Sequence, residues 1–154
     1  MALDADASSP AVVDASRVVT GSAQFSVGIN VTAAADAYNG YQWEIEYPAA
    51  SLAFDGSVVE NTSATGLDLC TNAILPAATP INAGDTVLGG GCLATSQPSY
   101  VGQTTTFRMH CVTTGTFSVL LIDLAHDRAF GTTLRAAGVA SSATGTAPIT
   151  ITCA

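Results

Sequence analysis

The stretch YQWEIEY at residues 41–47 alternates apolar and polar side chains without a break. Successive side chains of a β-strand point to opposite faces of the sheet, so the two sets separate onto two faces. The apolar face carries Tyr41, Trp43, Ile45 and Tyr47, and the polar face carries Gln42, Glu44 and Glu46. We therefore expect a strand whose apolar face enters a core with the single tryptophan of the chain, while the polar face meets solvent.

The rest of the chain repeats this two-residue period between turns rich in Gly, Pro, Asn and Asp. The alternation is strongest at residues 23–34, 104–112 and 148–153, and shorter candidate strands lie at 11–14, 57–61, 67–71, 86–94 and 116–125. Residues 126–145 form a long connection rich in Ala, Ser and Gly, in which we place no strand. No segment predicts a helix longer than two turns. Eight or nine short strands with frequent turns indicate an all-β sandwich.

Two further expectations concern the ends of elements. Residues 1–10 are small and polar, and we expect a flexible lead-in there, followed by a single domain over residues 11–154. They lack the basic start and apolar segment of a signal peptide, and we expect a leader or upstream region before Met1 in the native protein. The run Gly89-Gly90-Gly91 weakens its strand and indicates a bulge or a close backbone approach.

The charged residues exclude several classes of partner. The chain has 12 acidic residues, no lysine and a net charge of −8, and its four cations are Arg17, Arg108, Arg128 and Arg135. Nucleic acids and anionic membranes are bound through clustered cations, so neither is expected as a partner. No apolar run approaches the roughly 20 residues of a membrane span, so no membrane insertion is expected. An acidic surface would instead steer a basic partner toward the protein.

The four cysteines are Cys70, Cys92, Cys111 and Cys153, and none forms a CxxC pair. This spacing argues against a zinc site and against thioredoxin-type redox chemistry. An even count in a lysine-free, Thr-rich chain favours two disulfides and an oxidising compartment, hence an extracellular or cell-surface location. The alternative is four buried thiols. Three pairings are possible from the sequence alone.

No constellation of residues predicts catalysis. The two histidines, His110 and His126, lack the converging ligands that a metal site needs, so no metal site is expected. Glu44 and Glu46 have the spacing of paired glycosidase carboxylates, but two acids on one strand face usually form a wet surface. No serine lies in a GxSxG elbow and no lysine can form a Schiff base. Tyr38 and Tyr100, placed in loops, are the candidate contacts for a sugar ligand.

The run GYQWEIEYPAASLAF at residues 40–54 resembles the third-strand region of cohesin domains. Elements before and after it follow in the cohesin order, although the Asp that usually separates this Tyr from Pro is absent between Tyr47 and Pro48. The resemblance implies a nine-stranded jelly-roll sandwich. It also implies one flat recognition sheet, formed by strands near residues 41–47, 67–71, 86–94 and 118–128.

The resemblance further assigns roles to individual residues. Gln42, Glu44 and Glu46 would face out on the recognition sheet, and Leu93 would join them in binding the partner. Cys70 and Cys92 would lie on neighbouring strands and form one disulfide, which leaves Cys111 and Cys153 for the other. A dockerin, usually a small calcium-loaded helical pair, would be the partner, and calcium is the one cofactor that this implies.

The function that follows is a secreted or cell-surface scaffolding module that binds a protein partner and catalyses nothing. Two alternatives stay open. One is a carbohydrate-binding module, because such modules share the jelly-roll architecture and bind polysaccharides through exposed aromatic rings. The other is a structural subunit that packs against its own copies in a surface layer or filament.

Overall fold

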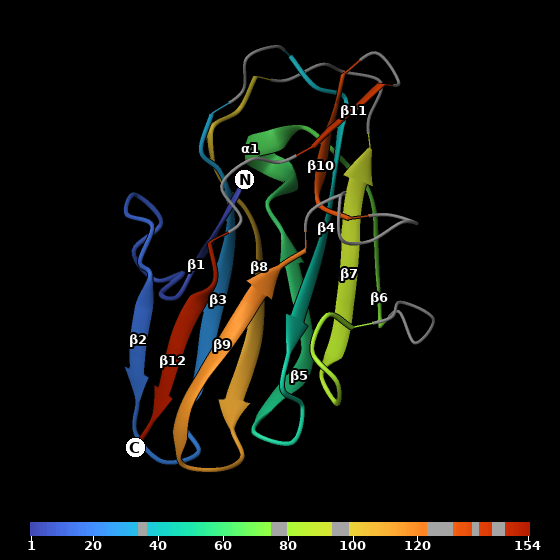
Figure 1. Cartoon of the computed structure of the whole chain (residues 1–154). Helices are drawn as coiled ribbons and strands as arrows, with labels where there is room; N and C mark the ends of the chain where they lie inside the picture. Colours follow the sequence, from blue (N-terminus) through green and yellow to red (C-terminus); the bar gives the residue numbers. More distant parts are fainter. Residues whose placement is uncertain (34–36, 75–79, 94–98, 123–130, 137–138, 143–146) are drawn as a thin grey trace.

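The computed structural model describes residues 1–154 except 34–36, 75–79, 94–98, 123–130, 137–138 and 143–146. The described residues form two facing β-sheets (Figure 1) with one four-residue helix, α1 (Thr62–Thr65). No described helix is long and apolar enough to cross a membrane. The strands are β1 (Ala2–Asp4), β2 (Ser16–Val19), β3 (Gln24–Val31), β4 (Gly40–Tyr47), β5 (Leu52–Glu60), β6 (Leu69–Ile74), β7 (Thr86–Leu93), β8 (Gly102–Cys111), β9 (Gly115–Leu121), β10 (Thr133–Ala136), β11 (Val139–Ser142) and β12 (Ile149–Cys153).

The first sheet has the strand order β1-β3-β8-β5, and the second is built around β4. One edge of β4 pairs antiparallel with β7, which pairs in turn with β6. The other edge of β4 pairs with β10 near its start and with β9 near its end. β9 leads on to β12 and β2, so the second sheet wraps across the whole width of the first. The all-β class is confirmed, and the short strands β10 and β11 lie within the connection where the sequence placed none.

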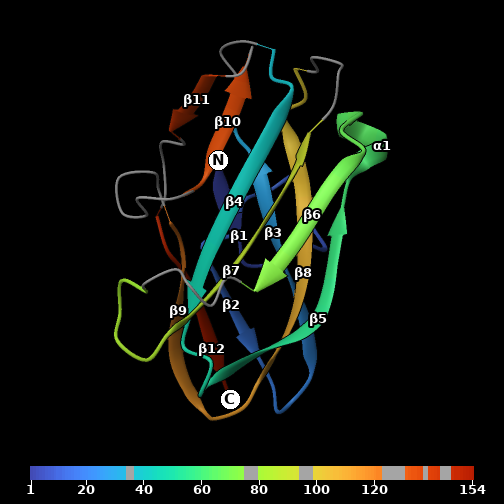
Figure 2. The ribbon, with the colours of Figure 1, turned by 90° about the vertical axis from the view of Figure 1, so that its right-hand side faces the viewer.

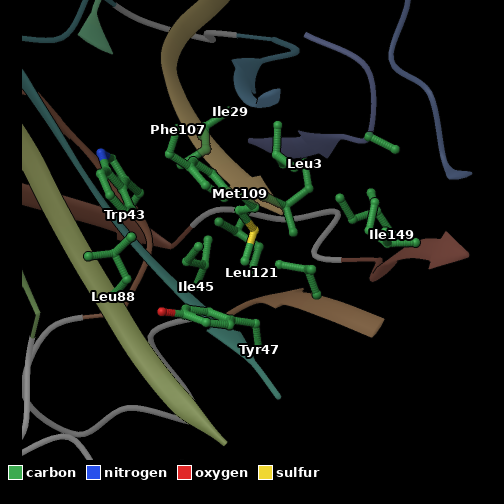
Figure 3. Packing of buried hydrophobic residues seen from close by; sticks show 14 of the residues in the cluster. Leu3, Ile29, Trp43, Ile45, Tyr47, Leu88, Phe107, Met109, Leu121 and Ile149 are labelled. Atoms are coloured by element: carbon green, nitrogen blue, oxygen red, sulfur yellow. The ribbon is translucent and has the colours of Figure 1, made fainter. Parts of the chain in front are cut away.

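The core lies between the sheets, and β4 supplies its aromatic centre. Tyr41, Trp43, Ile45 and Tyr47 are all buried, as the alternation of residues 41–47 predicted. The Trp43 ring stacks on Phe107 of β8 across the sandwich, with 6.1 Å between the ring centroids. Figure 3 shows Trp43, Ile45 and Tyr47 directed toward Phe107 and Met109. Full burial of one such side chain stabilises the fold by roughly 1.5–3 kcal/mol.

The beginning of the chain is not the flexible lead-in expected for residues 1–10. β1 pairs with β3, and Met1, Leu3 and Ala5 belong to the core. The buried Asp4 carboxylate accepts hydrogen bonds from the backbone N–H groups of Asp6 and Asp14, which folds the intervening loop back onto the sandwich. Residues 11–14 form no strand. The strand here is β2, which pairs in parallel with β12.

The four cysteines form two disulfides, and their pairing is the expected one. Cys70–Cys92 joins β6 to β7 at a position where the two residues lie directly opposite each other. Cys111–Cys153 joins β8 of the first sheet to β12 of the second. The first bridge therefore fastens an edge strand, and the second fastens one sheet to the other.

Candidate partner-binding face

Figure 2 shows the strands β10, β4, β7 and β6 side by side. Their outer face carries a transverse row of residues in register. Arg135 lies opposite Gly40, Gly40 opposite Leu93, and Leu93 opposite Leu69. The Leu93 side chain lies over Gly40, because its Cδ2 atom occupies the space that a Cβ at Gly40 would need. Leu69 and Leu93 are 67% and 50% exposed, so this row presents two large apolar side chains to solvent.

A groove of about 470 Å³ runs along this face. Gly89, Gly90 and Gly91 contribute no side chains, so the surface is hollowed where β7 crosses it. A Cβ at Gly91 would lie 2.5 Å from the Tyr41 backbone oxygen, which confirms the close backbone approach predicted for these glycines. No bulge is present, since β7 pairs with β4 and β6 without a register shift. The groove is lined by Tyr41, Gln42, Trp43, Glu44, Leu69, Thr71, Gly89, Gly90, Gly91, Cys92, Leu93 and Arg135.

The expectation that Glu44 and Glu46 face solvent is wrong. Both are on the outer side of β4, as the alternation requires, yet both are fully buried. Glu46 accepts hydrogen bonds from Ile81 N (2.5 Å), Asn82 N (2.7 Å) and Asn82 Nδ2 (2.9 Å). Glu44 accepts one from Gly131 N (3.1 Å). Their carboxylates hold crossing segments against the sheet, so they are occupied in the fold and form no acidic docking surface.

Gln42 and Leu93 remain at the groove. Gln42 is half-buried, and its Nε2 atom donates to the Gly131 backbone oxygen at 2.9 Å. Leu93 stands exposed at the rim next to Leu69. Of the four residues expected to contact a partner, these two are placed where contact is possible. Nothing in the sequence pointed to Leu69 or Arg135 as contact residues, because their shared row with Leu93 exists only once β6, β7 and β10 assemble beside β4.

The two candidate sugar-binding tyrosines are not a surface platform. Tyr38 is only 1% exposed and donates its hydroxyl hydrogen to the Tyr100 backbone oxygen at 2.8 Å. Tyr100 is half-buried against the core, and its hydroxyl donates to the Gln103 backbone oxygen at 3.3 Å. A tyrosine in a loop can thus be as buried as one in a strand when its hydroxyl finds a backbone acceptor. The carbohydrate-binding hypothesis rested on Tyr38 and Tyr100, and these two rings do not form an exposed platform for a sugar.

These buried phenols predict a loss of stability at alkaline pH. Burial, with a smaller repulsive effect of Tyr100, raises the pKa of Tyr38 to about 12. Tyrosines of the unfolded chain titrate near pH 10, so the folded state holds this proton more tightly. The resulting stabilisation is complete below about pH 10 and is lost as the pH rises toward about 12. Urea unfolding between about pH 8 and about pH 11 should show this decline in the free energy of unfolding. The decline should be shallower for Tyr38→Phe, which has no hydroxyl to titrate. Parallel curves for the two proteins would show that Tyr38 does not cause the decline.

A half-buried carboxylate, for which the sequence offered no direct signal, binds the polar tips of Tyr41 and Trp43 from the opposite sheet. Glu60, the last residue of β5 on the opposite sheet, accepts hydrogen bonds from Tyr41 Oη (2.7 Å), Trp43 Nε1 (3.3 Å) and Thr105 Oγ1. Burial raises the pKa of this carboxyl. The signal that could have found it is the pair Tyr41 and Trp43, because buried aromatic rings with polar tips need partners for those tips.

Metal and catalytic sites find no support in the part of the chain that the structure describes. No group of three or more His, Cys, Asp or Glu side chains there could hold a metal ion. His110 is half-exposed, and its Nδ1 atom lies 2.5 Å from Asp55 Oδ1. His126 lies outside the described residues, as do the last positions of the predicted strand at 118–128.

Comparison with known proteins identifies the fold. No family model matches the chain, and no curated protein matches it. The cohesin module of a family 33 glycoside hydrolase from Clostridium perfringens matches with a TM-score of 0.58 and 10% identity, over 89% of this chain and 91% of that one. CaCohA2 of Clostridium acetobutylicum, solved in a complex, gives 0.62 and 14%, over 90% and 97%. A type I cohesin–dockerin complex from Clostridium thermocellum gives 0.50 and 7%, over 90% of each chain. The chain therefore has a cohesin-like fold, an all-β jelly-roll sandwich.

Proposed function

We propose that this protein is a non-catalytic scaffolding module that binds a protein partner on the outer face of β10, β4, β7 and β6. The groove over the three glycines carries this proposal. No described segment covers the part of the sheet on which it lies, whereas the neighbouring polar positions Glu44 and Glu46 are buried under crossing segments. Exposed Leu69 and Leu93 at its rim are the kind of apolar side chains that fill the centre of protein interfaces.

The partner class follows from the structural neighbours. One of them is described as a cohesin–dockerin complex, and a dockerin is accordingly the partner that we propose for this chain. Two disulfides support a secreted or cell-surface location, because such bonds persist in oxidising compartments. Because the sequence identity to these structures is low, we propose a class of partner, the dockerin modules, and not one particular dockerin.

Leu93→Asp is expected to weaken partner binding at least tenfold, because a carboxylate would be desolvated at the centre of an apolar contact. Binding would be measured by isothermal titration calorimetry against a panel of purified dockerins, with and without calcium. Val59→Asp is the matched control. Val59 is 60% exposed on β5 of the opposite sheet, so the same change there should leave binding intact.

Two results would count against the proposal. If the dockerins bind the Leu93→Asp and wild-type proteins equally, the docking face is elsewhere. If no dockerin of the panel binds, the proposed partner class is wrong. Both variants should retain the blue-shifted emission of the buried Trp43, which reports that the sandwich has folded.

A further inference from the structure

We infer that the partner segment seated in this groove carries a carboxylate, which pairs with Arg135, next to a large apolar side chain that packs beside Leu93 in the hollow of the groove. This inference rests on the proposed docking face and adds the chemistry that the face selects. It reverses the expectation from net charge, under which an acidic protein would recognise a basic partner.

The acidic side chains of this face are not exposed in the groove. Glu44 and Glu46 are fully buried and accept hydrogen bonds from the backbone of crossing segments. Their negative charges are therefore not presented at the surface of the groove. Among the described residues that line the groove, the others are apolar or uncharged except Arg135.

Arg135 lines the groove and forms no ion pair with another described residue. It is half-buried at the groove, on a protein whose net charge is −8. Among the described residues the ion pairs are Arg17–Asp6 and His110–Asp55, and Arg135 takes part in neither. An arginine that lines a groove without a carboxylate partner in the described part of the chain is available to a carboxylate of another molecule. Guanidinium is also well suited to this role, because its planar donors bind a carboxylate through two parallel hydrogen bonds.

The distance between Arg135 and Leu93 matches the spacing of side chains on a helix. Arg135 and Leu93 lie in the same transverse row, separated only by Gly40, which has no side chain. Neighbouring strands are about 4.8 Å apart, so the two Cα atoms are separated by roughly 10 Å. On a helix, residues one turn apart are about 5–6 Å from each other, and two turns span about 11 Å. A helix with Asp or Glu one or two turns from a Leu, Ile or Phe can therefore reach Arg135 and the hollow at the same time.

The ligand chemistry is a single carboxylate on an apolar surface. A polyanion such as a nucleic acid would meet one local cation and the repulsion of the remaining protein, so it does not fit. Long-range attraction from the acidic surface still favours a partner with positive charge elsewhere. The carboxylate at Arg135 therefore fixes the orientation of the partner and adds specificity.

The test uses a phage-displayed library of a small three-helix scaffold with randomised surface positions. Selection against the wild-type protein, with removal of clones that also bind Leu93→Asp, retains binders of the groove. We expect these clones to be enriched in Asp or Glu beside a large apolar residue. They should bind Arg135→Glu at least tenfold more weakly and Arg135→Gln about fivefold more weakly, and their affinity should fall as NaCl rises from about 0.05 to about 0.5 M.

Arg108→Glu is the matched control, because Arg108 is an exposed arginine on β8 of the opposite sheet and the change in net charge is the same. Unfolding midpoints followed through Trp43 show whether each variant is folded. Groove-dependent clones enriched in Lys or Arg, or clones indifferent to both Arg135 variants, would overturn the inference and leave the docking face standing. A library with no Leu93-dependent clone would contradict the docking face and the inference together.

Discussion

Replacing both Cys111 and Cys153 by alanine is expected to lower the free energy of unfolding by about 4 kcal/mol. The bridge closes a loop with a sequence separation of 42, for which the chain-entropy treatment gives this magnitude. It also joins β8 of one sheet to β12 of the other, and both cysteines are buried in the core. Without it, the last strand is held to the first sheet by side-chain packing alone. Urea unfolding followed through Trp43 fluorescence measures the loss.

The matched comparison is the double alanine variant of Cys70 and Cys92. This bridge has a sequence separation of 22, so the same treatment gives about 3 kcal/mol. The bridge also links β6 and β7, which are already paired within one sheet. The loss should therefore be smaller than for the first pair. A larger loss from the Cys70–Cys92 pair, or a loss below about 1 kcal/mol from the Cys111–Cys153 pair, would show that the sheets are held together chiefly by other contacts.

Replacing Glu60 by alanine is expected to cost about 3–5 kcal/mol, because it removes the carboxylate acceptor of two donors and the shortest hydrogen bond of a third, at about 1–3 kcal/mol each. The donors are Tyr41 Oη, Trp43 Nε1 and Thr105 Oγ1. They come from both sheets, so the carboxylate fastens β5 and β8 to β4. The measurement is again urea unfolding. A variant about as stable as the wild type would mean that water satisfies these groups.

The pH dependence of this cluster has a definite sign. Burial raises the pKa of the Glu60 carboxyl in the folded state, so the folded protein binds this proton more tightly than the unfolded chain does. The resulting stabilisation is complete below the unfolded pKa and is lost as the pH rises through the folded pKa. Glu60→Gln cannot titrate, so its unfolding free energy should lack this decline. It should also be about 1–3 kcal/mol less stable at low pH, because its amide brings two N–H donors into a cluster of donors where the protonated carboxyl brings one.

The exposed Asp68 provides the control for that series, since Asp68→Asn removes one carboxyl outside the cluster. Its unfolding free energy should follow the wild-type curve between about pH 4 and about pH 8. If Glu60→Gln follows the wild-type curve as well, protonation of Glu60 does not cause the pH dependence of the unfolding free energy.

The strands of the sandwich could be predicted because their signal is local. The alternation at 41–47, 104–112 and 148–153 needs only a period of two residues, and β4, β8 and β12 lie there. The short strand β1 was missed because three residues are too few to show a period. Leu3 becomes a core residue only because β3 offers a partner 26 residues further on.

The binding face could be predicted only in part. Leu93 and Gln42 lie at the groove, whereas Glu44 and Glu46 are buried by segments far away in the sequence. The Glu46 carboxylate meets Asn82, and that of Glu44 meets Gly131. Neither contact leaves a trace in the residues next to the glutamates. Tyr38 was misplaced for the same reason, since its hydroxyl is satisfied by Tyr100, 62 positions away.

Three properties of this protein follow from its residues alone: it forms strands, the side chains of YQWEIEY separate onto two faces, and acidic groups are in excess. Those properties depend on backbone geometry and composition. The assembled sandwich settles the placement of Glu44 and Glu46 under crossing segments, the contact of Glu60 with Tyr41 and Trp43, and the position of Arg135 at the groove. These depend on which distant segments cross the sheet, because burial and hydrogen bonding join groups through space and not along the chain.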